Sequence, residues 1–197
     1  MSRAVRMAAF LATLLAVAPA AAAALEWAVD HEDSRLRFVT SQSGAPVTGR
    51  FERFTAAIRF SREALADSRV EIVIDMASVT TGSDDRDETI RSASLFHVET
   101  YPQARFVADR FERRGEESYI ARGELTIRDT TRPVELPFRL TVRPQPDNSG
   151  VLVARARGEI TIKRLDYGVG QGQWRDTSMV PNEVTIRFEL RATRPQA

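Results

Sequence analysis

The sequence predicts an all-β protein: an eight-stranded antiparallel barrel with one short helix inserted between strands. Two observations indicate this class. Apolar and polar residues alternate along most of the chain, with turn signals at fairly regular spacing, which is typical of a β-sandwich or a barrel. Several alternating runs are long, about ten residues, which favours a sheet that coils and closes on itself.

Residues 1–24 have the features of a cleaved signal peptide. Arg3 and Arg6 form a basic start, Met7 to Val17 an apolar core, and Ala22-Ala23-Ala24 an A-x-A cleavage site. The apolar run is too short for a comfortable membrane span, so an uncleaved anchor is the less favoured alternative. We therefore expect export and one domain over residues 25–193.

The composition argues against several kinds of site. Lysine and arginine total 28 and aspartate and glutamate 27, so the chain lacks the basic field that nucleic-acid binding requires. There is no cysteine, which removes disulfides, thiolate metal sites and thiol nucleophiles. His31 and His97, the only histidines, lie in no metal-ligand spacing. We expect no metal, no cofactor and no enzymatic activity.

The strand pattern of the first half contains two expected irregularities. His31-Glu32-Asp33 is predicted to turn the chain between two strands. The run from Val47 to Phe60 changes phase, which a β-bulge near Glu52-Arg53 would explain. The clearest inward face follows, at Val70, Ile72, Ile74 and Met76.

The stretch from Thr80 to Phe106 interrupts the strands with a helix predicted at about residues 85–93. Ser83, Asp84 and Asp85 carry side-chain oxygens that can cap its start, and Asp85 with Glu88 approximates a capping box. Calcium binding by these acids is the alternative, but their spacing differs from that of a calcium loop. Tyr101-Pro102 then returns the chain to extended structure.

The second half alternates again, with a hairpin turn near Gly115 and a strand from Val134 to Val142. Pro137 within this strand indicates an edge or a bulge. The next strand places the small residues Ala154, Ala156 and Gly158 inward, which either leaves open space in the barrel or accommodates its curvature.

Arg164 and Asp166 are expected to share a face of this strand because they are two residues apart. Arg164 could then meet a ligand head group, or it could pair with Asp166 and fix the loop that follows. That loop, Gly168-Val169-Gly170-Gln171-Gly172, matches no phosphate-binding motif and is predicted to be a turn.

Three segments resemble the signatures of the YceI family: the run from Ser78 to Phe106, the run from Gly123 to Val134, and Ile162 to Gly168. The likeness covers nearly all of Leu25 to Leu190, with the motifs in order. It implies a periplasmic, lipocalin-like barrel that holds a polyisoprenoid in an elongated apolar cavity. Residues 44–51 and 170–174 resemble a branch associated with membrane b-type cytochromes. A quinone tail is therefore as consistent with the resemblance as a polyprenyl phosphate.

The expected function is that of a non-enzymatic carrier of an isoprenoid lipid, with a membrane b-type cytochrome or a second copy of the chain as further candidate partners. The alternative is an accessory protein with a solid barrel, which docks on a membrane redox partner through exposed Trp174 and Tyr167. Strand phase, the helix and the resemblance select the candidate ligand contacts, which are Trp27, Phe38, Phe54, Ile72, Ile74, Ile90, Phe96, Phe106, Phe138, Arg164, Tyr167 and Phe188.

Overall fold

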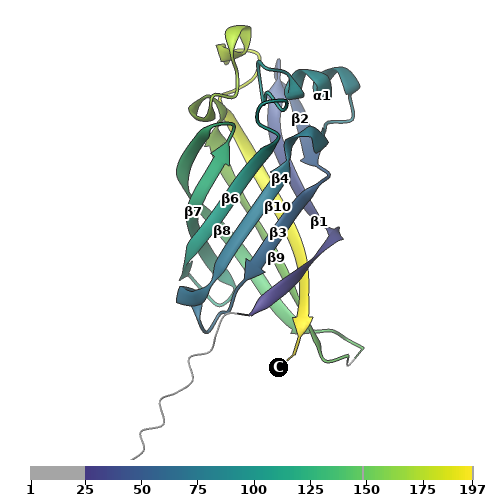
Figure 1. Cartoon of the computed structure of the whole chain (residues 1–197), viewed down its shortest axis with the longest axis vertical. Coiled ribbons are helices and arrows are strands. Elements are labelled where there is room, and N and C mark those ends of the chain that lie inside the picture. The colour runs from purple at the N-terminus through teal and green to yellow at the C-terminus, as the bar shows by residue number, and fades with distance from the viewer. Residues whose placement is uncertain (1–24, 148, 197) are drawn as a thin grey trace, which may run out of the picture.

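The computed structural model describes residues 25–147 and 149–196, which form a closed antiparallel barrel (Figure 1). Its strands pair in the order β10-β9-β8-β7-β6-β4-β3-β1-β2-β5, and β10 also pairs with β1. Within the described residues eight strands make the ring, as predicted, because β2 and β3 act as one bent strand and β5 lies outside it. The bounds are β1 Glu26–Gln42, β2 Ala45–Phe51, β3 Phe54–Arg59, β4 Arg69–Asp75, β5 Val79–Thr80, β6 Gln103–Arg113, β7 Ser118–Ile127, β8 Thr130–Pro144, β9 Val151–Lys163 and β10 Glu183–Pro195.

The long strand β1 closes the barrel. Its start pairs with β3, its end with β2, and its other edge with β10. Between β2 and β3, Glu52 and Arg53 leave the ladder and donate their N–H groups to Ser78, to its carbonyl at 3.2 Å and its hydroxyl at 3.0 Å. The predicted irregularity near Glu52-Arg53 is therefore present, and it bends the strand around the barrel.

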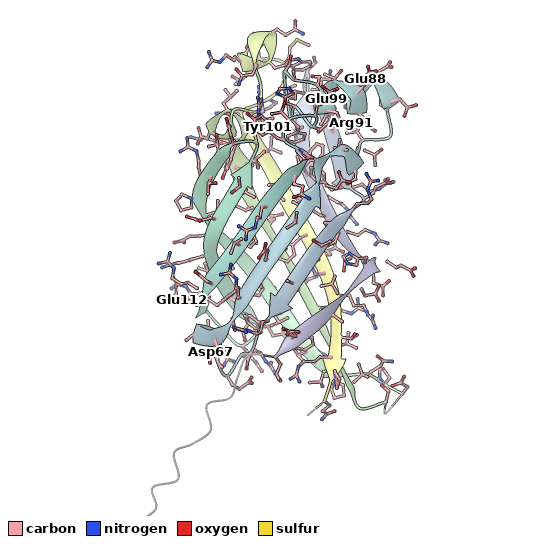
Figure 2. The ribbon with its side chains drawn as sticks, in the orientation of Figure 1. Asp67, Glu88, Arg91, Glu99, Tyr101 and Glu112 are labelled. Atoms are coloured by element: carbon pink, nitrogen blue, oxygen red, sulfur yellow. The ribbon has the colours of Figure 1, made fainter. Side chains whose placement is uncertain are left out.

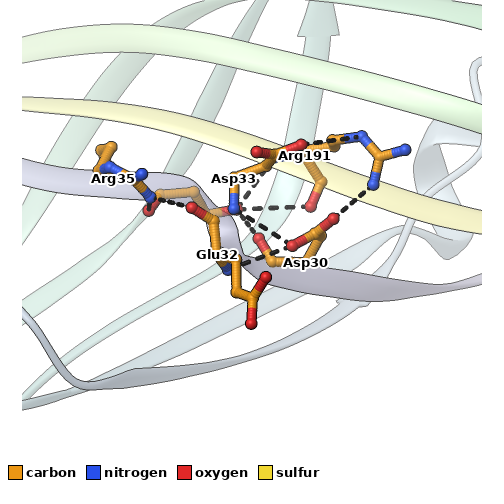
Figure 3. A network of polar contacts seen from close by, with 6 residues as sticks. Asp30, Glu32, Asp33, Arg35 and Arg191 are labelled. Carbon is orange, nitrogen blue, oxygen red and sulfur yellow. Dashed lines mark hydrogen bonds and ion pairs between the residues drawn. The ribbon is translucent and has the colours of Figure 1, made fainter.

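The turn predicted at His31-Glu32-Asp33 is wrong, because these residues form a bulge inside β1 (Figure 3). The Asp30 carboxylate accepts the N–H groups of Glu32 at 3.1 Å and Asp33 at 3.2 Å and pairs with the Arg191 guanidinium. The buried Ser34 hydroxyl accepts the Arg191 N–H at 3.0 Å. Side chains thus satisfy the backbone groups that the bulge removes from the ladder, so the strand kinks without reversing.

Pro137 lies where the pairing of β8 with β9 ends. Paired residues on β8 run from Pro144 back to Phe138, and the part of β8 before Phe138 pairs only with β7 in the described ladder. Leu140 donates its N–H to Glu117 O at 2.8 Å, on the β7 side. Since N–H directions alternate along a strand, position 137 would direct an N–H toward β9, and proline has none. Pro137 therefore lies where one side of β8 is locally unpaired, which is compatible with the predicted edge or bulge.

Helix α1, Asp84–Arg91, lies across one end of the barrel, close to the predicted 85–93 (Figure 1). The predicted capping box is wrong: Ser83 is the N-cap, and its side chain makes no capping hydrogen bond with a described residue. Asp87 acts instead. Its side chain is buried, and it accepts hydrogen bonds from the Thr81 N–H at 2.8 Å and hydroxyl at 2.6 Å. The helix is therefore tied to the end of β5.

Inward positions of the strands carry the apolar core, and charged side chains cover the outer wall (Figure 2). Asp67 marks one end of the barrel, while Glu88, Glu99 and Tyr101 mark the other, where α1 lies. Within the described segments, no helix combines the length and apolar character that a membrane crossing requires.

Candidate ligand-binding cavity

The main cavity has a volume of about 380 Å³ and occupies the α1 end of the barrel. Its walls are the inward positions of the strands, because side chains that alternate along a strand line one face of the sheet. The apolar residues of its lining are Leu36, Phe38, Val47, Phe51, Ile74, Met76, Ile90, Leu95, Phe96, Ala104, Leu125, Ile127, Ile162, Val169, Trp174, Val180, Val184 and Ile186.

Polar groups gather around part of the same cavity. They come from the end of β1 and from α1: Thr40, Ser41, Gln42, Ser83, Asp85, Arg86 and Thr89. Arg86 forms no ion pair with another described residue. A molecule with a long apolar tail and a polar head group fits this distribution, since the tail leaves water while the head group keeps hydrogen-bond partners.

A second cavity of about 90 Å³ occupies the other half of the barrel interior. Ala154 and Ala156 line it, so these two small residues of β9 do border open space, as one of the two interpretations predicted, whereas Gly158 lines neither cavity. The Trp27 indole lies at its wall and donates to Phe60 O at 3.0 Å. Aromatic rings surround this space, with Phe60 edge-on to Phe111, Tyr119 and Phe138.

Ten of the twelve residues predicted as ligand contacts line one of these cavities, and their role as contacts stays a prediction. Phe54 and Tyr167 are buried but line neither cavity. Those at the main cavity are Phe38, Ile74, Ile90, Phe96 and Arg164; those at the second are Trp27, Ile72, Phe106, Phe138 and Phe188.

Arg164 lies at the edge of the main cavity and is 5% exposed. The predicted pairing with Asp166 on a strand is wrong, because residues Arg164–Tyr167 form a 3₁₀ helix after β9. Its guanidinium donates instead to carbonyls of the following loop, at 3.0 Å to Val169, 3.0 Å to Pro181 and 2.9 Å to Val180. Burial lowers the pKa of Arg164. The carbonyl dipoles thus stabilise the positive charge of Arg164. Its guanidinium holds the loop in place and is already hydrogen-bonded without a ligand head group.

Residues 168–182, here called the cap loop, lie at the α1 end of the barrel and contribute Val169, Trp174 and Val180 to the main cavity. Backbone hydrogen bonds tie the loop to distant segments, among them Gln171 N–H to Ser94 O at 2.7 Å and Ser43 N–H to Met179 O at 2.7 Å. Sequence reasoning did not select these lining residues, because an irregular loop has no periodicity to show which side chains face inward.

Tyr167 is buried, at 3% exposure, so its predicted place on an exposed docking surface is wrong. Burial raises the pKa of its phenol. Trp174 is half-buried and lines the main cavity. The exposed apolar side chain of the cap loop is instead Met179, at 54% exposure.

The described residues contain no group of three or more histidines, aspartates or glutamates close enough to hold a metal ion. His97 lies in a turn with a φ of 52°, and its ring shares a hydrogen bond of 3.0 Å with the Thr100 hydroxyl. Its predicted role as a turn histidine agrees with this position.

The amino-acid sequence is similar to those of several bacterial UPF0312 proteins. The chain is 30% identical to a UPF0312 protein from Photorhabdus laumondii over 125 residues, which is 63% of this chain and 65% of that protein. It is 27% identical to a UPF0312 protein from Shewanella baltica over 156 residues, or 78% of this chain and 81% of that protein. The matched stretch covers just under two thirds of the first relative.

Solved structures share the fold. BcnA from Burkholderia cenocepacia superposes with a TM-score of 0.74 at 32% identity, covering 83% of this chain and 98% of BcnA. A polyisoprenoid-binding domain from Saccharophagus degradans, implicated in plant cell wall breakdown, superposes with a TM-score of 0.64 at 21% identity, covering 87% and 99%. The profile of the YceI-like domain matches residues 27–192. The chain therefore belongs to the YceI-like domain family.

Proposed function

We propose that this chain is a non-enzymatic periplasmic carrier that holds an isoprenoid lipid by its tail inside the barrel. The observation that carries the proposal is the main cavity, about 380 Å³ with apolar strand walls and polar residues on one side. Burial of an apolar tail stabilises a complex by about 0.8 kcal/mol for each CH₂ group. The solved polyisoprenoid-binding domain with the same fold supports this ligand class.

The polar side of the cavity supports a head group that accepts hydrogen bonds, such as a phosphate or a quinone carbonyl. Arg86 is the charged donor there. Arg164 is a weaker candidate than its sequence context suggested, because its guanidinium already donates to four loop carbonyls.

The carrier function predicts a sharp difference between two neighbouring positions of β4. Ile74 faces the main cavity, while Val73 alternates to the outer face of the same strand. We expect Ile74→Glu to remove co-purifying lipid because a buried carboxylate would face the tail, and Val73→Glu to leave the lipid content unchanged. Organic extraction followed by mass spectrometry measures both. Circular dichroism must show that both variants are folded. A folded Ile74→Glu variant that keeps its lipid would contradict the carrier function.

The alternative, an accessory protein that docks on a membrane redox partner such as a b-type cytochrome, has one favourable observation. Met179 presents a largely exposed apolar side chain on the cap loop. Under this alternative, Met179→Ser would disrupt co-purification with the membrane partner, and lipid content would be zero in the unsubstituted protein.

A further inference from the structure

The two cavities lie one above the other along the same strands. On β4, Ile74 lines the main cavity and Ile72 lines the second. On β10, Ile186 lines the main cavity and Phe188 the second. Consecutive inward positions of one strand therefore belong to different cavities, and the layer between them divides the barrel interior.

Phe106 and Phe188 are the inward residues of β6 and β10 at which the lining changes from the main cavity to the second. On β6, the small Ala104 lines the main cavity and the next inward residue, Phe106, lines the second. β6 and β10 are four strands apart in either direction around the eight-stranded ring of the described chain, so they face each other across the barrel. The two rings project from opposite sides into the same interior.

Gly158 creates room for this arrangement on the β10 side. It pairs with Phe188 on one side and with Phe138 on the other. A Cβ atom at Gly158 would lie 2.8 Å from the Phe188 ring and 3.1 Å from the Phe138 Cβ. The absence of a side chain lets the Phe188 ring lie over the β9 backbone, so its position is set by the sheet itself.

The volumes of the two cavities set the length of isoprenoid tail that each can hold. An apolar cavity of about 150 Å³ takes a six-carbon ring. By this ratio the main cavity, about 380 Å³, holds about 15 carbons, or about three isoprene units. The second cavity, about 90 Å³, holds about four carbons, which is most of one isoprene unit.

We propose that Phe106 and Phe188 form a partition that limits the bound tail to about three isoprene units in the main cavity, and that opening this partition admits about one unit more. This inference rests on the carrier function and adds the length of tail that the barrel takes. A longer tail still binds by its last units, but its remaining carbons stay outside the apolar interior.

Linear prenols of two, three, four and eight isoprene units test the partition, with dissociation constants measured by native mass spectrometry. For the unsubstituted protein we expect affinity to rise from two to three units and then to level off. For Phe106→Leu and Phe188→Leu we expect the four-unit prenol to bind about 200-fold more tightly than the three-unit prenol, because about four more carbons are buried. Phe54→Leu is the matched control, since Phe54 is as buried as Phe106 but lines neither cavity, and its length dependence should not change.

The two tryptophans give a second readout that does not depend on affinity. Trp27 lines the second cavity and Trp174 the main one. In a Trp174→Phe background, the four-unit prenol should change Trp27 fluorescence only when Phe106 or Phe188 has been replaced. An affinity that keeps rising through eight units in the unsubstituted protein, or an unshifted length dependence in both folded leucine variants, would overturn the partition while leaving the carrier function intact. Failure of every prenol to bind would refute the carrier function itself.

Discussion

At the scale of single residues, the two charged side chains that the described structure buries are stabilised by neutral hydrogen-bond partners rather than by oppositely charged ones. Arg164 is held by carbonyls of the cap loop, and Asp87 by Thr81. A buried charge that had no such partners would strongly destabilise the folded state. These two residues therefore fix the position of the elements around the main cavity, although neither has a charged partner at hydrogen-bond distance in the described structure.

Asp87 leads to a pH-dependent prediction. Burial alone would raise the pKa of Asp87, but hydrogen bonds from the side chains of Thr81 and Thr80 and from the Thr81 N–H hold it below its ordinary value. A depressed folded-state pKa contributes stability above the unfolded-state pKa, near 4, that is lost as the pH falls through the folded-state value. We expect Asp87→Asn to lower the free energy of unfolding by about 1–3 kcal/mol at pH 7, and by less at pH 3.

Urea unfolding at both pH values measures this difference. Asp85→Asn is the control, because Asp85 is an exposed neighbour on the same helix turn and makes no tertiary hydrogen bond with its carboxylate among the described contacts. A loss of stability in Asp87→Asn that is the same at pH 3 and pH 7 would show that the charge of Asp87 does not matter.

At the scale of elements, the cap loop depends on a glycine for its close approach to Arg164. Gly170 has a φ of 120°, and a Cβ there would collide with the Arg164 guanidinium and lie 2.7 Å from Trp174 O. We expect Gly170→Ala to displace the loop and lower the free energy of unfolding by at least 1–2 kcal/mol. Hydrogen exchange should become faster across residues 168–182.

Gly172→Ala provides the matched comparison. Gly172 also has a positive φ, of 57°, but a Cβ there meets no atom within 4 Å. Both variants carry the cost of a left-handed alanine, about 1–2 kcal/mol, whereas only Gly170→Ala adds the collision. Equal stability and equal exchange rates in the two variants would contradict the role of Gly170 in seating the loop.

Strand periodicity predicted most of the barrel, and it failed where side chains replace the backbone ladder. The alternation from Val70 to Met76 and the helix after Ser83 were enough to place these elements. The segment His31-Glu32-Asp33 looked like a turn because local composition cannot distinguish a reversal from a bulge. What decides between them is Arg191, which is distant in sequence and pairs with Asp30 across the β1–β10 ladder.

At the scale of the whole molecule, the candidate site could be predicted only in part. Strand phase selected eight of the twelve candidates, and seven of these eight line a cavity, since the barrel interior follows from alternation. The lining from the cap loop and from the segment after α1, such as Trp174 and Leu95, could not be found this way. The division of the interior was equally hidden, because it depends on which strands face each other after closure.

The central claim is that the barrel holds an isoprenoid tail in its main cavity. Native mass spectrometry of the protein purified from cells that express the full chain, with organic extraction of whatever is bound, is the decisive test. We expect a discrete mass excess in a one-to-one ratio, which disappears on extraction and is identified as an isoprenoid lipid. A bare polypeptide mass that is unchanged after incubation with prenols, polyprenyl phosphates and quinones would contradict it.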